Sequence, residues 1–460
     1  MVPASGVPGS PQDPPLTGTW SRLHPLSPVA RVVISLGVVL VVGIPSLTGA
    51  DQNGSSGQTV YVVVIAVAAV LGMVAAVVSW LVTRWRVVGD ELQIDTGLIY
   101  RQSLRFPLRR IQAVDIVAPL TARILGLAEV RVISAGTGHH QRGHLAYLSN
   151  QDAAAVRAQL LALAHGLAPE TPEPPALPLF RVDNGRLIGA SLLRGAWLVL
   201  LVFLAGSVAL AVAGPTGAGG PGRVSGTAAV ASLVSAALTG LLALGLDAAR
   251  AVNGDFDFTI GEAPDGLRLH RGLLQKRHET IPYGRIQAVR LIQPLLWRPF
   301  GWARVELDVA RQPEARHQGE ARQLAHLLAP VATLGDARWL IGRLAPGVPA
   351  TPDRRGAPPR RAAWRAPLSY HYLSIWHDER WLATQTGRLR PATVIVPLEK
   401  VQSIRLESGP LLRALGLADV RVDTAGRRWV AEAVCRDERE ARGLVDQLSI
   451  LARRARRLSW

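Results

Sequence analysis

The chain has 460 residues, a formal net charge of +17 and a hydrophobic fraction of 48%. Only 18% of the residues are charged, which is low for a soluble globular protein. A single cysteine, Cys435, excludes an internal disulfide framework and a cysteine-based zinc site.

Long uncharged apolar runs dominate the first half of the chain. A helix needs roughly 20 apolar residues to cross a bilayer, and uncharged runs of about this length occur four times. These runs, which lack Asp, Glu, Lys and Arg, are 32–50, 59–83, 195–222 and 224–246. We therefore predict four transmembrane α-helices in two hairpins, with buried core helices as the alternative.

The distribution of basic residues predicts an orientation for these helices. Arginines flank both pairs of runs, whereas the short loop at 51–58 has no Lys or Arg and the loop at 214–226 has only Arg223. Basic residues favour the cytoplasmic side of a membrane. The expected protein is a multi-pass protein of the cell (inner) membrane with both termini in the cytoplasm.

One pattern, G-x9-P-x4-Q-x13-G, occurs three times with identical internal spacing. Chance does not keep four positions in register three times, so the chain carries three copies of one small domain. The four residues of each copy are Gly97, Pro107, Gln112 and Gly126; Gly272, Pro282, Gln287 and Gly301; and Gly387, Pro397, Gln402 and Gly416.

The repeats and the apolar runs divide the chain into eight parts. We predict a disordered tail over 1–29, transmembrane hairpins over 30–83 and 187–248, a Pro-rich linker over 166–186, a Pro/Arg-rich linker over 346–367, and repeat domains over 84–165, 252–345 and 368–458.

Each repeat is predicted to be mostly β-structure closed by one helix. Alternating strands such as Glu91–Asp95 lead to the first repeated glycine, which is expected at a hairpin turn with positive φ. A second strand ends at the repeated proline, and a third carries the repeated glutamine. Closing helices are predicted at 149–165, 334–344 and 437–457, the first with Ser149 as its N-cap. Such a repeat is expected to be a small β-barrel or bent sandwich capped by its helix.

Two strings within the repeats resemble a known family. They are Pro-x-x-[Arg/Lys]-[Ile/Val]-Gln in every repeat and Leu-Gly-Leu-Ala-[Glu/Asp]-Val-Arg-Val from Leu125 and from Leu415. The chain resembles the bacterial pleckstrin-homology-like (PH-like) domain of type 2, and its layout resembles the YdbT-like family of bacterial membrane proteins. The resemblance implies PH-like bent barrels with a C-terminal helix and no enzyme activity. The second repeat departs from the motif at Phe300–Val305 and carries a polar insertion from Gln312 to Arg322.

Six basic residues recur at two positions of the repeats and are candidate contacts for an anion or a partner. Guanidinium groups bind phosphate and carboxylate in bidentate fashion, so an anionic headgroup or acidic partner would suit them. The structural alternative, which we favour, is that they hydrogen-bond to carbonyl groups of nearby loops. The six are Arg110, Arg285 and Lys400 before the [Ile/Val]-Gln pair, and Arg123, Arg298 and Arg413 before the last repeated glycine.

No motif in the sequence indicates catalysis. Nucleophile-elbow, Walker, HExxH and dinucleotide-binding patterns are all missing, so we expect no enzyme and no cofactor. His139, His140 and His144 could hold a metal, but a solvated hairpin loop is the better interpretation, and we expect no metal site.

Together these features predict a non-enzymatic membrane protein whose cytoplasmic domains bind or scaffold a protein partner, with a role in envelope maintenance or stress response. The first alternative is a module that binds anionic phospholipid through arginine, and the second is a transporter or enzyme subunit. The basic charge lacks an aromatic-interleaved stripe, so no nucleic-acid partner is expected. The sequence leaves the oligomeric state open.

Overall fold

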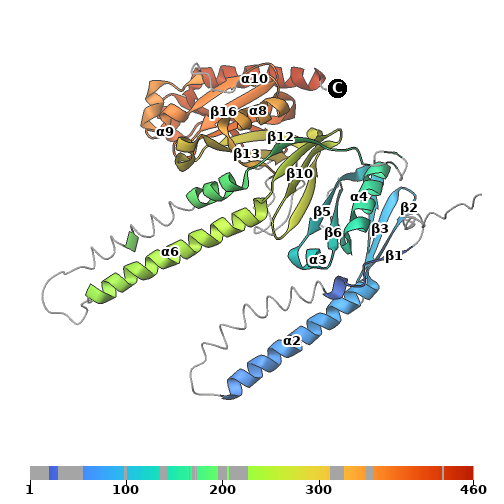
Figure 1. Ribbon diagram of the computed structural model, residues 1–460. Helices are drawn as coiled ribbons and strands as arrows, with labels where there is room; N and C mark the ends of the chain where they lie inside the picture. The colour runs from blue at the N-terminus through green and yellow to red at the C-terminus, as the bar shows by residue number, and fades with distance from the viewer. Residues whose placement is uncertain are drawn as a thin grey trace, which may run out of the picture. The chain divides into compact units, whose positions relative to one another are not determined.

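The computed structural model describes residues 20–29, 55–97, 101–134, 142–164, 166–167, 171, 173–194, 205–206, 226–310, 326–348, 356–426 and 429–458. The chain divides into two compact units. Unit 1 is 1–175 with 274–280, and unit 2 is 176–273 with 281–460. Figure 1 shows their helices and strands in chain order.

Unit 1 contains the first repeat and one strand from the second. Its strands are β1 (Ser21–Arg22), β2 (Arg84–Val88), β3 (Glu91–Thr96), β4 (Gln102–Pro107), β5 (Ile111–Ala118), β6 (Leu127–Ser134), β7 (Arg142–Ser149) and, up to Thr280, β11 (Lys276–Ile281). Its helices are α2 (Ser55–Val82), the 3-10 turn η1 (Leu108–Arg110), α3 (Leu120–Ile124) and α4 (Asn150–Ala164). The strands β1 to β4 form one antiparallel sheet in chain order.

Unit 2 contains the rest of the second repeat and all of the third. Its strands are β8 (Leu177–Arg181), β9 (Thr259–Ala263), β10 (Gly266–Arg271), β12 (Ile286–Ile292), β13 (Trp302–Val309), β14 (His326–Thr333), β15 (Ser374–His377), β16 (Trp381–Thr386), β17 (Ala392–Pro397), β18 (Val401–Glu407), β19 (Leu417–Thr424) and β20 (Ala431–Asp437). Its helices are α6 (Gly226–Asp255), η2 (Tyr283–Arg285), η3 (Leu295–Phe300), α8 (Leu334–Leu344), η5 (Arg360–Trp364), η6 (Tyr370–Tyr372), η7 (Leu398–Lys400), α9 (Pro410–Ala414) and α10 (Glu438–Leu458).

The local expectations from the repeat pattern are confirmed. The glycines Gly97, Gly272 and Gly387 have φ of 93°, 107° and 88°, the left-handed region that a residue with a Cβ avoids. The hydroxyl of Ser149 accepts the amide of Asp152 at 3.1 Å, which caps α4 as predicted. The closing helices α4, α8 and α10 begin and end within a residue or so of their predicted bounds.

Successive repeats are joined by pairing between equivalent strands. In each repeat one strand ends at the repeated proline (β4, β11, β17) and the next strand carries the repeated glutamine (β5, β12, β18). The glutamine strand β5 pairs antiparallel with the proline strand β11 of the second repeat, within unit 1. The glutamine strand β12 pairs in the same way with the proline strand β17 of the third repeat, within unit 2. We call these pairings the first junction and the second junction.

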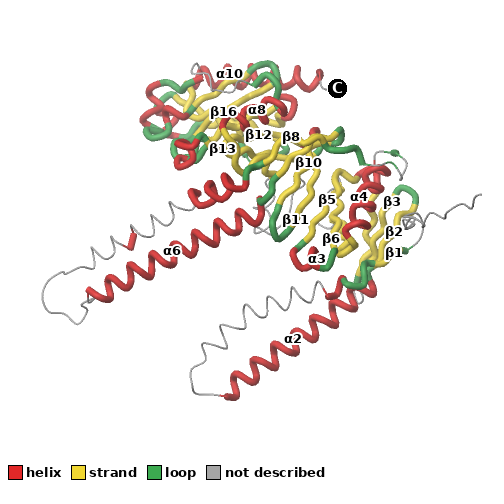
Figure 2. The backbone as a smooth tube through the Cα atoms, in the orientation of Figure 1, coloured by secondary structure: helices red, strands yellow, loops and turns green. Residues whose placement is uncertain are grey.

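Both junctions have the same register. The fourth residue after the repeated glutamine faces the fourth residue before the repeated proline, as Ile116 faces His278 and Leu291 faces Thr393. In the second junction the resulting sheet has six strands in the order β14-β13-β12-β17-β16-β15. The first half of the third repeat therefore shares a sheet with the second half of the second, as Figure 2 shows for the strands of unit 2.

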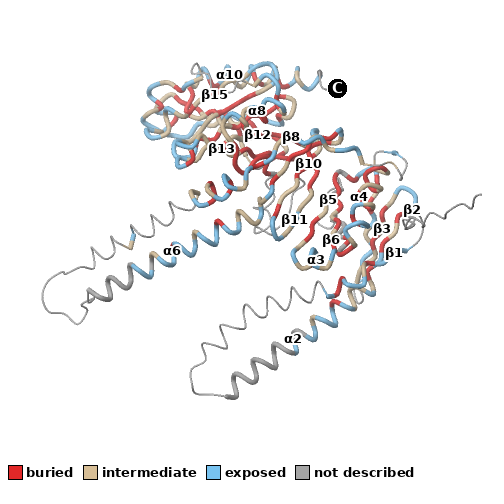
Figure 3. The backbone as a smooth tube through the Cα atoms, viewed as in Figure 1, coloured by how far each residue is buried: buried red, intermediate tan, exposed pale blue. Residues whose placement is uncertain are grey.

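Burial follows this strand arrangement. The unit 1 core surrounds Leu92, Phe106 and Leu160, and α4 covers β5 and β6. The core of the second repeat also takes in Ile395 of the third, while α10 packs over β18 and β19. Figure 3 shows that buried residues concentrate in the strands. Full burial of one large aliphatic side chain contributes about 1.5–3 kcal/mol, so each repeat has a substantial core.

The prediction of a membrane protein with four transmembrane helices is wrong. Among the described residues, no helix is long and apolar enough to cross a bilayer. The runs were chosen because they lack charge, but uncharged residues need not be strongly apolar. Helix α6 is rich in Gly, Ala, Ser and Thr, and its C-terminal part carries Asp247, Arg250 and Asp255. The run at 32–50 and nearly all of 195–222 lie outside the described residues.

Candidate functional site

Unit 2 contains a groove between the second and third repeats. Its volume is about 640 Å³. It is lined by Tyr283, Gly284, Ile286, Val289, Leu344 and Pro346 from the second repeat and the residues after it, and by Glu379, Arg380, Trp381, Pro397, Glu399, Lys400, Arg454 and Ala455 from the third. The second junction sets the spacing of the two walls, because β12 contributes Ile286 and Val289 to the lining and β17 contributes Pro397.

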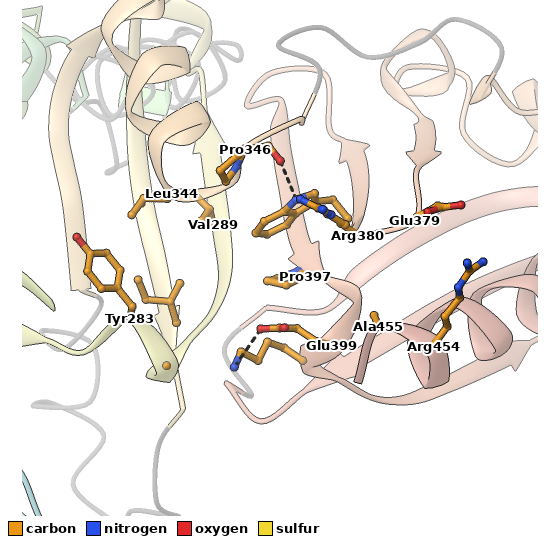
Figure 4. Close-up of a pocket in the computed structure, with 14 residues that line it drawn as sticks. Tyr283, Val289, Leu344, Pro346, Glu379, Arg380, Pro397, Glu399, Arg454 and Ala455 are labelled. Carbon is orange, nitrogen blue, oxygen red and sulfur yellow. Dashed lines mark hydrogen bonds and ion pairs between the residues drawn. The ribbon is translucent and has the colours of Figure 1, made fainter. Parts of the chain in front are cut away.

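The wall from the second repeat is apolar with a fixed phenol at its edge. Figure 4 shows Tyr283, Val289 and Leu344 on this side. The Tyr283 hydroxyl donates to Glu262 at 3.0 Å, and Arg343 forms an ion pair with the same carboxylate at 3.0 Å. Burial, followed by the hydrogen bond to Glu262, raises the pKa of Tyr283 to about 12, so its phenol stays neutral and acts as a donor.

The wall from the third repeat combines an indole with charged groups. The Trp381 indole donates to the carbonyl of Pro346 at 3.2 Å, which holds its ring against the groove. Lys400 forms an ion pair with Glu399 at 3.3 Å. In the described part of the chain, the guanidinium groups of Arg380 and Arg454 have neither a hydrogen-bond partner nor an ion pair. The groove therefore offers an apolar surface with two available cationic donors at its rim.

The six basic residues predicted from the repeats do not form one site. Arg110 on η1 and Arg123 on α3 belong to unit 1 and are exposed. Arg413 on α9 is exposed in unit 2, and Lys400 lines the groove. Their role in binding stays a prediction for these four positions.

The remaining two arginines hydrogen-bond to carbonyl groups, as the structural interpretation predicted. Arg285 donates to the carbonyl of Ala310 at 2.9 Å, which joins the start of β12 to the end of β13. Arg298 donates to the carbonyl of Arg388, and its guanidinium lies 5.2 Å from the ring centre of Tyr372. Arg298 thus fastens η3 of the second repeat to the β16–β17 turn of the third.

Sequence reasoning missed most of the groove. Tyr283, Arg380 and Trp381 are residue types that the other repeats do not carry at the same positions, so the repeat pattern does not mark them. Two sequence signals did point to the site: Lys400, one of the six predicted basic residues, and the repeated Pro397 both line the groove. The histidine cluster at 139–144 falls outside the residues whose side chains are described, and the described residues contain no group of metal-ligating side chains.

Comparison with known proteins identifies the repeats. The family model described as Bacterial PH domain matches three stretches of the chain, at residues 32–164, 198–332 and 329–451. These matches cover most of the chain and confirm the prediction of three PH-like repeats. No curated protein and no solved structure shows a significant match.

Proposed function

Because the chain belongs to the bacterial PH domain family, we propose that it is a non-enzymatic binding protein that scaffolds a protein partner through the groove of unit 2. PH-like domains suggest a binding or scaffolding role. A fold does not define a ligand, so the ligand must be argued from the site.

The observation that carries this proposal is the composition of the groove. Val289, Leu344 and Trp381 provide an apolar surface, and a cavity of about 640 Å³ accommodates one or two side chains of a partner segment. Arg380 and Arg454 at the rim favour a carboxylate on that segment. The expected occupant is a short segment of a protein with an apolar anchor beside an acidic residue.

Site-specific photo-crosslinking in cells tests the proposal. A photoreactive amino acid replaces Tyr283 in one variant and Trp364 in a control, because Trp364 is 85% exposed and does not line the groove. We expect a discrete adduct with another protein from position 283 alone. The additional substitution Arg380→Ala should weaken this adduct, since it removes a cation that no internal group needs. Equal labelling from both positions, or no adduct from position 283, would contradict the proposal.

A specific surface feature favours a second candidate function, binding to anionic lipid. The β16–β17 turn exposes Leu389, at 67%, between the exposed side chains of Arg388 and Arg390. The carbonyl of Leu389 accepts the amide of Leu295 at 2.9 Å, so this turn is held against η3, which exposes Phe300. Apolar side chains flanked by arginine suit the interface of an anionic bilayer, where each basic residue contributes about 1 kcal/mol.

Location of the protein at the cell membrane is a proposal that rests on this surface and on the net charge of +17. Kinship with the YdbT-like proteins is a separate proposal that rests on the motif strings of the three repeats. The membrane location is tested with the full chain, carrying a polarity-sensitive fluorophore on Leu389→Cys or, as control, Trp364→Cys. The native Cys435 is buried, so labelling is selective. A blue shift at position 389 with phosphatidylglycerol vesicles, weakened by salt, supports lipid binding. An unchanged spectrum, or an equal shift at position 364, excludes this surface as a lipid site.

A further inference from the structure

The first and third repeats each have a strand whose equivalent in the other repeats takes part in a junction. In the described part of the chain, the proline strand β4 pairs with β3 alone and the glutamine strand β18 pairs with β19 alone. Among the described residues, β4 therefore presents a free proline-strand edge and β18 presents a free glutamine-strand edge.

Several side chains on these two free strands are more exposed than their counterparts in the second junction. On the glutamine strands, Gln287 of β12 is 5% exposed, whereas Gln402 of β18 is exposed and Leu406 is 38% exposed. On the proline strands, the residues of β17 from Ala392 to Ile395 are nearly all buried, whereas Gln102, Ser103 and Arg105 of β4 are exposed. Edge strands with open hydrogen-bonding groups are templates for pairing with another chain.

We propose that β18 of one chain pairs antiparallel with β4 of a second copy of the same chain, continuing the junctions between repeats into a head-to-tail assembly. Both internal junctions join a glutamine strand to the proline strand of the following repeat in one register. The two free edges are also a glutamine strand and a proline strand, so a second copy presents to each edge the kind of strand that pairs with it in the junctions.

The register of the internal junctions specifies the contact. Applied to the free edges, it places Ile404 opposite Arg105, Arg405 opposite Leu104, Leu406 opposite Ser103 and Glu407 opposite Gln102. None of these pairs sets like charges directly opposite, an arrangement that would oppose pairing. The guanidinium of Arg456 covers the carbonyl of Val401 at 3.0 Å, but Val401 precedes the four residues that would pair.

The symmetry of such a contact determines its product. The two surfaces differ, so after one pairing the first copy still has a free β4 and the second copy still has a free β18. Contacts of this kind give open filaments, or rings if the rotation closes. Repeat proteins in general add units by nearest-neighbour interfaces, and here the neighbouring unit would be a separate chain.

Disulfide trapping between two differently marked chains tests the proposal. One full-length chain carries Ser103→Cys and the other Leu406→Cys, and the two are mixed and oxidised. Residues directly opposite on antiparallel strands have Cβ atoms about 4.5–5.5 Å apart, which allows a disulfide after a small adjustment. We expect a disulfide-linked dimer in the mixture and none from either chain alone.

A one-residue shift provides the matched control. A mixture of Ser103→Cys and Arg405→Cys chains presents the same edges, but the two thiols lie on opposite faces of the sheet. This mixture should give no dimer. The unmodified chain should give none either, because Cys435 is buried.

Sedimentation of the unlinked protein provides an independent measurement. The unmodified chain should show a mass that rises with concentration, and Leu406→Asp should abolish this rise, because it places a charge in the centre of the contact. Leu406 is partly exposed, so this variant should keep its fold, which circular dichroism verifies.

Four results would overturn the proposal. The first is that folded chains form no in-register disulfide, and the second is that the shifted pair reacts equally well. The third is a disulfide that forms only within a single chain carrying both cysteines. The fourth is a purified chain that stays monomeric while Leu406→Cys is captured in cells by a different protein. The third result would show that β18 pairs with β4 of the same chain, and the fourth would show that a strand from a different protein pairs with this edge. None of these results affects the groove, which is tested by position 283.

Discussion

The first and second junctions share one register but are stabilised by different chemistry. In the second junction, β12 and β17 contribute Val289, Ile292 and Ile395, which are buried in apolar surroundings. In the first junction, the residues around the β5–β11 pairing include the buried Arg157 and Glu279 and the half-buried Asp115. The repeat pattern therefore specifies where strands meet, whereas the residues between the repeated positions decide whether the contact is apolar or charged.

The charged junction depends on one guanidinium group. Arg157 of α4 is 6% exposed and donates to Glu173 at 3.1 Å and to the Thr280 hydroxyl at 2.9 Å. The amide of Thr280 in turn donates to Asp115 at 3.3 Å. These contacts connect the first repeat, the segment that follows α4, and β11.

The largest effect is expected from Arg157→Ala. This substitution leaves buried acidic groups without their cation, so the free energy of unfolding of unit 1 should fall by about 3–5 kcal/mol. The measurement is urea denaturation followed by hydrogen exchange of the β5 and β11 amides. The matched control is Arg109→Ala, which removes an exposed ion pair with Asp90 in the same unit and should change little. An equal effect of both variants would show that the first junction does not depend on Arg157.

A somewhat smaller effect is expected from Ile395→Ala in the second junction. Ile395 is 3% exposed, and its truncation leaves a cavity that should cost about 2–5 kcal/mol. Hydrogen exchange of β12 and β17 in unit 2 reports this loss, and the amides of β5 in unit 1 should be unaffected. Leu389→Ala, on the exposed turn beside β17, should have a minor effect. A loss confined to unit 1 would contradict the assignment of Ile395 to this junction.

The third expected effect is a pH dependence of the charged junction. Burial is the main cause that raises the pKa of Asp115 from 3.8 to about 7, and the Glu279 carboxylate adds to it, while the Thr280 amide, Arg157 and Arg131 oppose it. The folded form thus holds a proton that the unfolded chain releases at lower pH. The free energy of unfolding of unit 1 should therefore fall as the pH rises from about 4 to about 7, and then level off.

Asp115→Asn removes this titrating group while keeping an acceptor for the Thr280 amide. The pH dependence of β11 hydrogen exchange, corrected for the intrinsic exchange rate, should become flatter in this variant. The β17 amides of the second junction should show no change in their pH profile on the same substitution. A pH profile of β11 that is identical in both proteins would show that Asp115 does not titrate in this range.

The sequence by itself determined the three repeats and most of their local structure. Spacing of glycine, proline and glutamine predicted the strands and the positive φ of Gly97, and the cap at Ser149 predicted the start of α4. These features depend on interactions within a few residues, such as steric limits on φ and hydrogen bonds to the first helical turn. The motif strings carried the resemblance to the family, whereas the uncharged apolar runs led to the wrong prediction of transmembrane helices.

Only the tertiary structure decided which strands from different repeats pair and which side chains form the groove. Tyr283 and Trp381 lie about a hundred residues apart, and they line one cavity because β12 and β17 pair. Arg298 looked like a ligand-binding residue in the sequence, yet its partner is a carbonyl of the next repeat. Pairing between repeats depends on contacts between residues that are distant along the chain, and packing and burial set the energy of these contacts. A periodic sequence pattern shows only the positions that all three repeats share, so it does not predict these contacts.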